Sequence, residues 1–195
     1  MSMTIGLFAF PDMEMLDYAG PYQVFASASR IAAAQTGQEA FSLMTIAPSH
    51  EAVKVRAGAT VLPQASIHDH PVLDCLVLPG GMAGVTPLLE NQEVIDWIKA
   101  QADTAPIIAS VCTGTFLLAQ TGLLDGLEAT THYTYHDELR RTHPDIKVRA
   151  QRRWVDSGRF ITAAGLSAGI DMTCHLVERL TTRDLSVATA KVLEL

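Results

Sequence analysis

The 195-residue sequence is poor in charge and in cysteine, and its charges are mostly acidic. Only 18% of the residues are charged, and 21 acidic against 14 basic side chains give a formal net charge of −7. The negative balance argues against a nucleic-acid backbone as the main partner, and 48% hydrophobic residues exclude a disordered chain. Three widely separated cysteines are too few for a disulfide framework and indicate reduced thiols in a cytoplasmic protein.

Several functional signals are also missing. Neither G-x-x-x-x-G-K nor G-x-G-x-x-G occurs, and the first residues lack the basic leader of a signal peptide. His68 and His70 alternate like metal ligands, but no third ligand is evident, so we expect no metal and no cofactor. Residues 104–124 carry no charge and have about the length of a membrane-spanning helix. Because proline, glycine and threonine interrupt this stretch, we expect no membrane segment and interpret it as buried inside a soluble protein.

The sequence does contain an alternation of short apolar runs with helical patterns. Apolar runs predict strands over residues 4–10, 41–47, 72–78 and 106–111, and helical spacing predicts helices over 21–34, 91–102 and 113–120. The remaining predicted elements are hairpins over 53–62 and 148–162 and closing helices over 167–180 and 186–195. Apolar strands between helices are typical of a parallel sheet covered on both faces. No linker or repeat interrupts the pattern, so we expect one doubly wound α/β domain over residues 1–195.

One strand end has the pattern of a nucleophile elbow. Ligands bind beyond the carboxyl ends of the strands in such a sheet, and one end reads Ser-Val-Cys112-Thr-Gly. Small residues two positions before and after the central one are what an elbow requires. Cys112 would then point out at a helix N-terminus, where free N–H groups favour thiolate. The alternative is a small buried hydrophobic residue, as we expect for Cys75 and Cys174.

Other segments supply candidate partners for the thiol. Gly80 and Gly81 follow the third predicted strand, and their N–H groups could join that of Thr113 in stabilising negative charge; a tight turn without function is the alternative. Asp17, after the first strand, either caps the next helix, beginning near residue 21, or reaches over the elbow as general acid and base. His132 either orients the thiolate or is a core histidine.

Four segments in combination resemble the ThiJ/PfpI superfamily, whose fold is related to class I glutamine amidotransferases. They span nearly the whole chain in the expected order and comprise PGG at 79–81, the elbow at 110–114, ATTHY at 129–133 and ITAAGLSAGID at 161–171. The resemblance implies a flavodoxin-like, mainly parallel sheet sandwiched by helices. Within the superfamily, LDYAGP at 16–21 is typical of isonitrile hydratases and of the sensor domains of AraC-type transcription regulators.

The resemblance implies hydration of an isonitrile to an N-substituted formamide through a thioimidate on Cys112. Asp17 would supply the proton, Thr113 would hold the thiolate, and Gly81 would contribute an N–H group. An isonitrile offers few hydrogen-bonding groups, so we expect an apolar pocket lined by residues such as Tyr18, Met82 and Tyr133.

Two alternatives to an isonitrile hydratase remain. One is a non-catalytic ligand-binding or redox-sensing domain; the regulators continue into a helix-turn-helix domain, whereas this sequence stops at Leu195, so a free-standing enzyme is favoured. The other is a glyoxalase-like or amidase-like activity, and such relatives often carry histidine where this chain has Thr113. The resemblance also implies a homodimer that acts on a small-molecule substrate.

Overall fold

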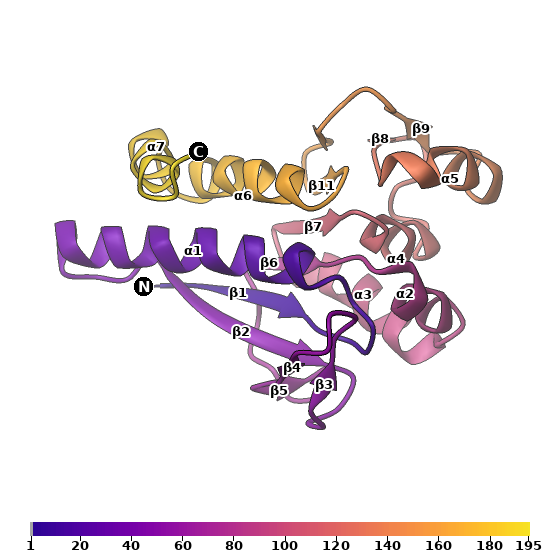
Figure 1. The fold of residues 1–195 in the computed structure, drawn as a ribbon, viewed down its shortest axis with the longest axis horizontal. Coiled ribbons are helices and arrows are strands. Elements are labelled where there is room, and N and C mark those ends of the chain that lie inside the picture. The colour runs from indigo at the N-terminus through magenta and orange to yellow at the C-terminus, as the bar shows by residue number, and fades with distance from the viewer. Residues whose placement is uncertain (1) are drawn as a thin grey trace.

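A seven-stranded sheet forms the centre of the computed structural model, which describes residues 2–195 (Figure 1). In spatial order its strands are β10 (Trp154–Asp156), β11 (Phe160–Ala163), β7 (Ile107–Val111), β6 (Cys75–Leu78), β1 (Met3–Phe8), β2 (Phe41–Ala47) and β5 (Ala65–Ser66). Neighbouring strands are parallel except β10 and β11, which are antiparallel at one edge. The chain moves outward from β1 to β2 and later returns to pair β6 with β1. The switch in strand order therefore lies between β1 and β6, where such sheets bind ligands.

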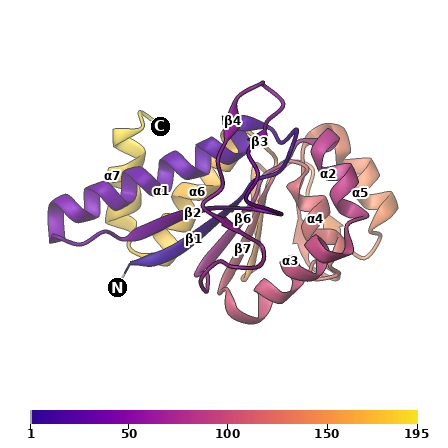
Figure 2. The same cartoon turned by 90° about the horizontal axis from the view of Figure 1, so that it is seen from below.

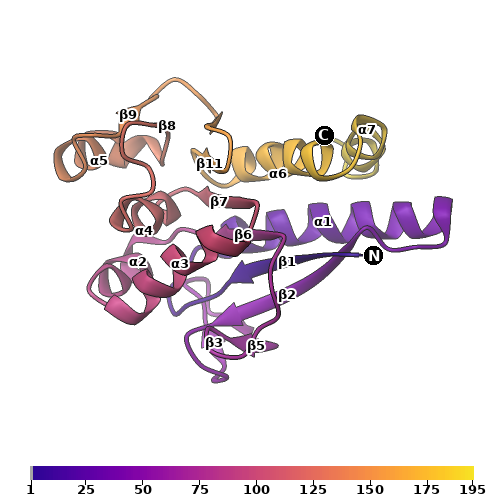
Figure 3. The same ribbon diagram turned by 180° about the vertical axis from the view of Figure 1, so that it is seen from behind.

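Helices cover both faces of this sheet, as the views in Figures 1, 2 and 3 show. One face carries α1 (Met15–Thr36), α6 (Ser167–Leu180) and α7 (Arg183–Val192), and the other carries α2 (Met82–Leu89), α3 (Gln92–Thr104) and α4 (Gly114–Gln120). Beside α4 lie the short strands β8 (Glu128–Ala129) and β9 (Lys147–Val148), a 3-10 turn (Tyr133–Tyr135) and α5 (His136–Thr142). The remaining strands, β3 (Val53–Lys54) and β4 (Thr60–Val61), form an antiparallel hairpin. The doubly wound α/β architecture is confirmed.

The uncharged stretch at 104–124 forms part of the core. Every residue of β7 is buried, and so are the first six residues of α4, which packs behind it. A central strand and a covered helix have no surface on which to place charge, and this explains the composition of the stretch. Among the described residues, no helix is long and apolar enough to cross a membrane.

The first predicted helix and the second predicted hairpin have different boundaries in the structure. The first helix begins at Met15, so Pro21 lies inside α1 and removes one backbone hydrogen bond there. Buried contacts of Val24 and Phe25 in the same helix hold it to the sheet despite that loss. The hairpin predicted over 148–162 is shorter: β10 and β11 form it, while β9 pairs in parallel with β8.

Several short elements were not predicted, and the last helix is shifted. The helical pattern of α2 is interrupted by Gly84 and Pro87. The elements α5 and β5, with only seven and two residues, are too short to give a clear pattern. The last helix begins at Arg183 because Thr182 caps it by accepting the N–H of Leu185 at 3.2 Å.

Candidate active site

Cys112 occupies the turn between β7 and α4. Its φ of 57° lies in the left-handed region, the strained conformation that an elbow imposes on its central residue. Close packing requires the glycines around it. A Cβ on Gly114 would lie 2.3 Å from the carbonyl oxygen of Leu78, and a Cβ on Gly80 would lie 2.8 Å from the Cβ of Cys112. The elbow predicted from the sequence is present.

Asp17 reaches the elbow from the first turn of α1. Its carboxylate is buried and accepts hydrogen bonds from the N–H of Leu166 at 2.8 Å and the N–H of Gly80 at 3.2 Å. The N-cap of α1 is Glu14, so the alternative that Asp17 caps a helix starting near Pro21 is wrong. The carboxylate instead lies at the switch between β1 and β6, beside the elbow.

Asp17 and Cys112 form a hydrogen-bonded pair, in which the thiol donates to the carboxylate. Burial raises the pKa of Asp17 to about 6, although the N–H groups of Leu166 and Gly80 oppose the rise. Burial also raises the pKa of Cys112 to about 12, and the negative charge of Asp17 adds to that effect. The N–H of Thr113 at the helix N-terminus does act to lower the pKa of the thiol, as expected, but burial and the charge of Asp17 outweigh it, so the expected thiolate is not the resting form. At neutral pH the proton is on sulfur and the negative charge is on Asp17.

Thr113 contributes two donors to the sulfur atom. Its backbone N–H and its hydroxyl both bond to Cys112 and act to lower the pKa of the thiol. The Thr113 hydroxyl oxygen also accepts the N–H of Gly81 at 2.9 Å. We expect from the sequence that the N–H groups of Gly80 and Gly81 converge on a developing anion. In the structure they donate instead to the side chains of Asp17 and Thr113. They position the two side chains that contact the thiol.

The segment at 129–133 supports the elbow from behind. The hydroxyl of Thr131 donates to the carbonyl of Cys112 at 2.8 Å, and the Nε2 of His136 lies 2.9 Å from the carbonyl oxygen of Thr131. Burial lowers the pKa of His136, which favours its neutral form. The ATTHY segment therefore fixes the backbone of the nucleophile, a role that the sequence did not indicate.

The thiol opens into a pocket of about 210 Å³. Met82 lines this pocket, as expected, and so does His132, which is therefore not a core histidine. The pocket is also lined by residues that the sequence did not indicate, among them Glu14, Arg56, Thr134, Tyr135 and Leu166. Arg56 comes from the turn between β3 and β4, and its guanidinium lies 3.7 Å from the carboxylate of Glu14.

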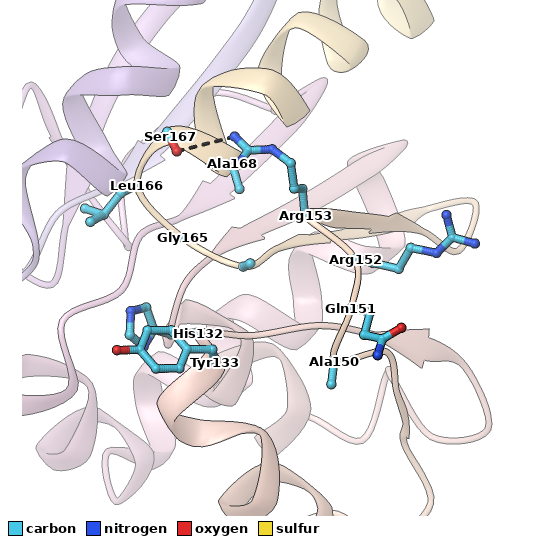
Figure 4. A pocket seen from close by; sticks show the side chains of 11 residues that line it. His132, Tyr133, Ala150, Gln151, Arg152, Arg153, Gly165, Leu166, Ser167 and Ala168 are labelled. Atoms are coloured by element: carbon cyan, nitrogen blue, oxygen red, sulfur yellow. Dashed lines mark hydrogen bonds between the residues drawn. The ribbon is translucent and has the colours of Figure 1, made fainter.

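A second hollow, of about 410 Å³, adjoins the thiol pocket and shares His132 and Leu166 with it. Tyr133 lines this hollow (Figure 4). This residue is 77% exposed. Tyr18 is different: it is buried, and its hydroxyl lies 2.6 Å from the Oγ1 of Thr45 on β2. The expectation that Tyr18 lines the substrate pocket is therefore wrong, because this side chain packs α1 against the sheet.

Gly165 and Leu166 lie in the loop after β11, one and two residues beyond Ala164, and were not among the candidate site residues. Gly165 has a φ of 143°, and a Cβ there would lie 3.4 Å from the Sγ of Cys112 and 3.5 Å from the Cδ2 of His132. The same rule that located the elbow, that ligands bind beyond the carboxyl ends of parallel strands, points to these residues when it is applied to β11.

The histidines at 68 and 70 have other partners. His68 lies 3.7 Å from Glu93, and His70 accepts the indole N–H of Trp97 at 2.7 Å. Within residues 2–195, no group of three or more His, Cys, Asp or Glu side chains is placed to hold a metal ion.

Fold and site together define a doubly wound α/β protein with a buried cysteine at a nucleophile elbow and a carboxylate from the first helix paired to it. The chain belongs to the DJ-1/PfpI family, whose pattern matches residues 3–179. The superfamily resemblance inferred from the sequence is confirmed.

Named relatives include an enzyme and a transcriptional regulator. Isonitrile hydratase from Pseudomonas putida is 36% identical over 196 residues, which cover 100% of this chain and 78% of the hydratase. The HTH-type transcriptional regulator GbdR from Pseudomonas aeruginosa is 26% identical over 97% of this chain, which spans only 50% of the regulator.

Solved structures share the fold over the full length of the chain. A ThiJ/PfpI family protein from Pseudomonas syringae has a TM-score of 0.87 at 26% identity, and the match covers 100% of this chain and 75% of that one. DJ-1beta from Drosophila melanogaster has a TM-score of 0.84 at 22% identity, with coverage of 100% and 99%.

Proposed function

We propose that the protein hydrates isonitriles to N-substituted formamides, with Cys112 as nucleophile and Asp17 as proton carrier. The observation that carries this proposal is the buried thiol–carboxylate pair in a small pocket at the elbow. The 36% identity to an isonitrile hydratase over the whole chain supports the substrate class.

The first step joins sulfur to the substrate. The terminal carbon of an isonitrile, R–N≡C, has a lone pair and can accept a proton. The thiol proton passes to Asp17 and then to that carbon while the S–C bond forms, which gives the thioimidate Cys112–S–CH=N–R. The two donors of Thr113 stabilise the sulfur while it carries negative charge. An acid with a pKa of about 6 is suited to Asp17's task, because it can accept and release a proton near neutral pH.

The second step releases the product. Water adds to the thioimidate carbon, Asp17 takes a proton from that water, and the nitrogen gains one. The C–S bond then breaks, sulfur regains its proton, and R–NH–CHO leaves. Substrate, water, Cys112 and Asp17 account for every atom and proton in the overall reaction of R–NC with H₂O.

Steady-state formation of formamide from cyclohexyl isonitrile tests the proposal. We expect turnover by the wild type, none by Cys112→Ala, and strongly reduced turnover by Asp17→Asn. Cys174→Ala is the matched control, because it removes a thiol that is only partly buried and lies on α6, away from the elbow. Full activity in Cys112→Ala would refute the proposal.

The similarity to GbdR favours a second candidate, a domain that binds a ligand without turnover. Under this alternative, ligands would bind in the same pocket and peroxide would oxidise Cys112, but no formamide would accumulate. A glyoxalase-like or amidase-like activity would appear as turnover of methylglyoxal or of an amide. Sedimentation velocity of the purified protein tests the expected homodimer.

A further inference from the structure

The hollow beside the thiol pocket has no part in the chemistry proposed above. It occupies about 410 Å³, against about 210 Å³ for the thiol pocket, and His132 and Leu166 line both spaces. Gly165, another wall of the hollow, brings it close to sulfur, since a Cβ at this position would lie 3.4 Å from the Sγ of Cys112. No more than the width of one side chain therefore separates the hollow from the reacting sulfur atom.

Arg153 holds the far wall of the hollow in place. Its Nε donates to the carboxylate of Asp171 at 2.8 Å, and its guanidinium also bonds to the hydroxyl of Ser167, as Figure 4 shows. The N–H of Ala164 donates to the carbonyl of Arg153 at 2.8 Å. These bonds connect the loop between β9 and β10 to α6 and to the end of β11. In Figures 1 and 3 this loop arches away from the rest of the molecule. The hollow is therefore formed before a ligand enters, which lowers the cost of binding.

The lining of the hollow suits a large uncharged group. Tyr133 is 77% exposed and lies against the ring of His132, with the two ring centroids 4.6 Å apart. Leu166, on the opposite side in Figure 4, is 40% exposed. The Arg153 charge is paired with Asp171, and Figure 4 shows the Arg152 side chain directed away from the two rings. An apolar group that covers both the exposed tyrosine and the exposed leucine facing it is bound favourably, because it removes apolar surface from water.

We propose, on the basis of the hydration proposed above, that this hollow is the subsite for the R group and selects isonitriles with a large, uncharged, flat R group. An isonitrile is linear, so attack by Sγ on the terminal carbon directs R away from the sulfur. The R group passes between His132 and Leu166 and lies on Tyr133. Leu166 sets the width of that passage, and Tyr133 provides the surface on which R rests.

Two alkyl isonitriles of matched reactivity test the subsite. In both 2-naphthylmethyl isonitrile and ethyl isonitrile the nitrogen is bonded to a methylene group, so the ratio of their kcat/KM values reports recognition of R. Burial of each methylene contributes about fourfold, so covering an apolar area equal to about three or four methylenes, less than half of the naphthyl group, would favour the naphthyl compound by about a hundredfold. Tyr133→Ala should lower this ratio about tenfold, because it removes the aromatic surface.

Ala150→Trp provides the second variant, because Ala150 is exposed in the hollow and a larger side chain there fills the space without disturbing the core. We expect it to lower the ratio at least as much as Tyr133→Ala does. Val72→Trp is the matched control: Val72 is exposed and precedes β6, at the end of the sheet opposite the site, so the ratio should stay at the wild-type value.

The outcomes separate this inference from the proposed function. If the wild type hydrates neither compound, the proposed function fails and the subsite fails with it. If it hydrates both, but the ratio is near one or is unchanged in Tyr133→Ala and Ala150→Trp, the subsite is overturned while hydration stands. The subsite is also overturned if Ala150→Trp leaves the ratio of the two kcat/KM values unchanged but alters the sedimentation coefficient. That result would assign the hollow to a contact between copies of the chain.

Discussion

Replacing Asp17 with Asn is expected to make Cys112 more reactive toward iodoacetamide while it removes hydration activity. Burial is the largest cause of the raised pKa of Cys112, and the amide leaves it unchanged. The next cause is the negative charge of Asp17, and its loss lowers the pKa of the thiol. The same change removes the proton carrier, so we expect hydration to fall by roughly 10²- to 10⁴-fold.

The size of the gain in thiol reactivity follows from the charge that is removed. Two unit charges about 4 Å apart interact by about 4 kcal/mol at an effective dielectric constant of about 20, so the pKa of Cys112 should fall by about one to three units. Each unit gives about tenfold more thiolate, but a less basic thiolate is a weaker nucleophile. The net gain in alkylation rate is therefore about threefold per unit.

The substitution is also expected to lower the free energy of unfolding, and this effect must be measured. The amide NH₂ faces the N–H of Gly80, which donates to Asp17 in the wild type, so one buried donor loses its acceptor. Such a loss costs about 1–3 kcal/mol of unfolding free energy. Thermal unfolding of Asp17→Asn shows whether the variant is folded under the conditions of the assay.

Mass spectrometry of the peptide that contains Cys112 gives the rate of carbamidomethylation at pH 8, in parallel with formamide production. Asp12→Asn is the control, since Asp12 is an exposed carboxylate in the loop before α1 and both rates should stay near wild type. Slower alkylation in folded Asp17→Asn than in the wild type would refute the account of how Asp17 controls the thiol.

Three further predictions concern the same site. The kcat/KM for hydration should rise with pH through about 6 and then stay level, because Asp17 must be ionised to accept the thiol proton; a pH profile without that limb would contradict this. The pKa of Asp17 is raised from 3.8 to about 6 on folding, so the wild type should lose about 3 kcal/mol of stability relative to Asp17→Asn as pH rises from about 4 to above 6. Urea unfolding at the two pH values measures this change. If the difference in unfolding free energy between the wild type and Asp17→Asn were the same at both pH values, Asp17 would titrate normally. Gly165→Ala places a Cβ 3.1 Å from the Cβ of Cys112 at a φ of 143°, so we expect a loss of about 1–3 kcal/mol in thermal unfolding and a lower kcat/KM; a neutral variant would show that the loop after β11 adjusts.

Local patterns in the sequence were enough to predict six of the seven strands of the sheet, all but β5, and the elbow. The strand over 41–47 has the predicted boundaries, and the small residues around Cys112 have the packing roles that a strand-to-helix turn requires. These features depend on residues close together in the chain, so a single sequence contains their signals. Pro21 misled the helix boundary because tertiary packing outweighs the lost hydrogen bond.

Features that depend on distant residues could not be predicted. The thiol pKa depends on burial and on a carboxylate from another helix, so the elbow motif alone indicated the wrong protonation state. Similarly, Tyr18 is expected in the pocket as a loop residue, but it lies in α1 and its hydroxyl is directed to Thr45 on β2. The hydrogen bond from the N–H of Leu166 to Asp17 could not be predicted either, because the two residues lie 149 positions apart in the chain.

The central claim is that Cys112 forms a covalent thioimidate, and mass spectrometry of protein quenched in acid during turnover tests it most directly. With 2-naphthylmethyl isonitrile in excess, we expect the peptide containing Cys112 to gain the mass of one isonitrile. This adduct should disappear as the substrate is consumed and the formamide accumulates. Formamide release with Cys112 unmodified at every time point, and with undiminished rate in Cys112→Ala, would contradict the account.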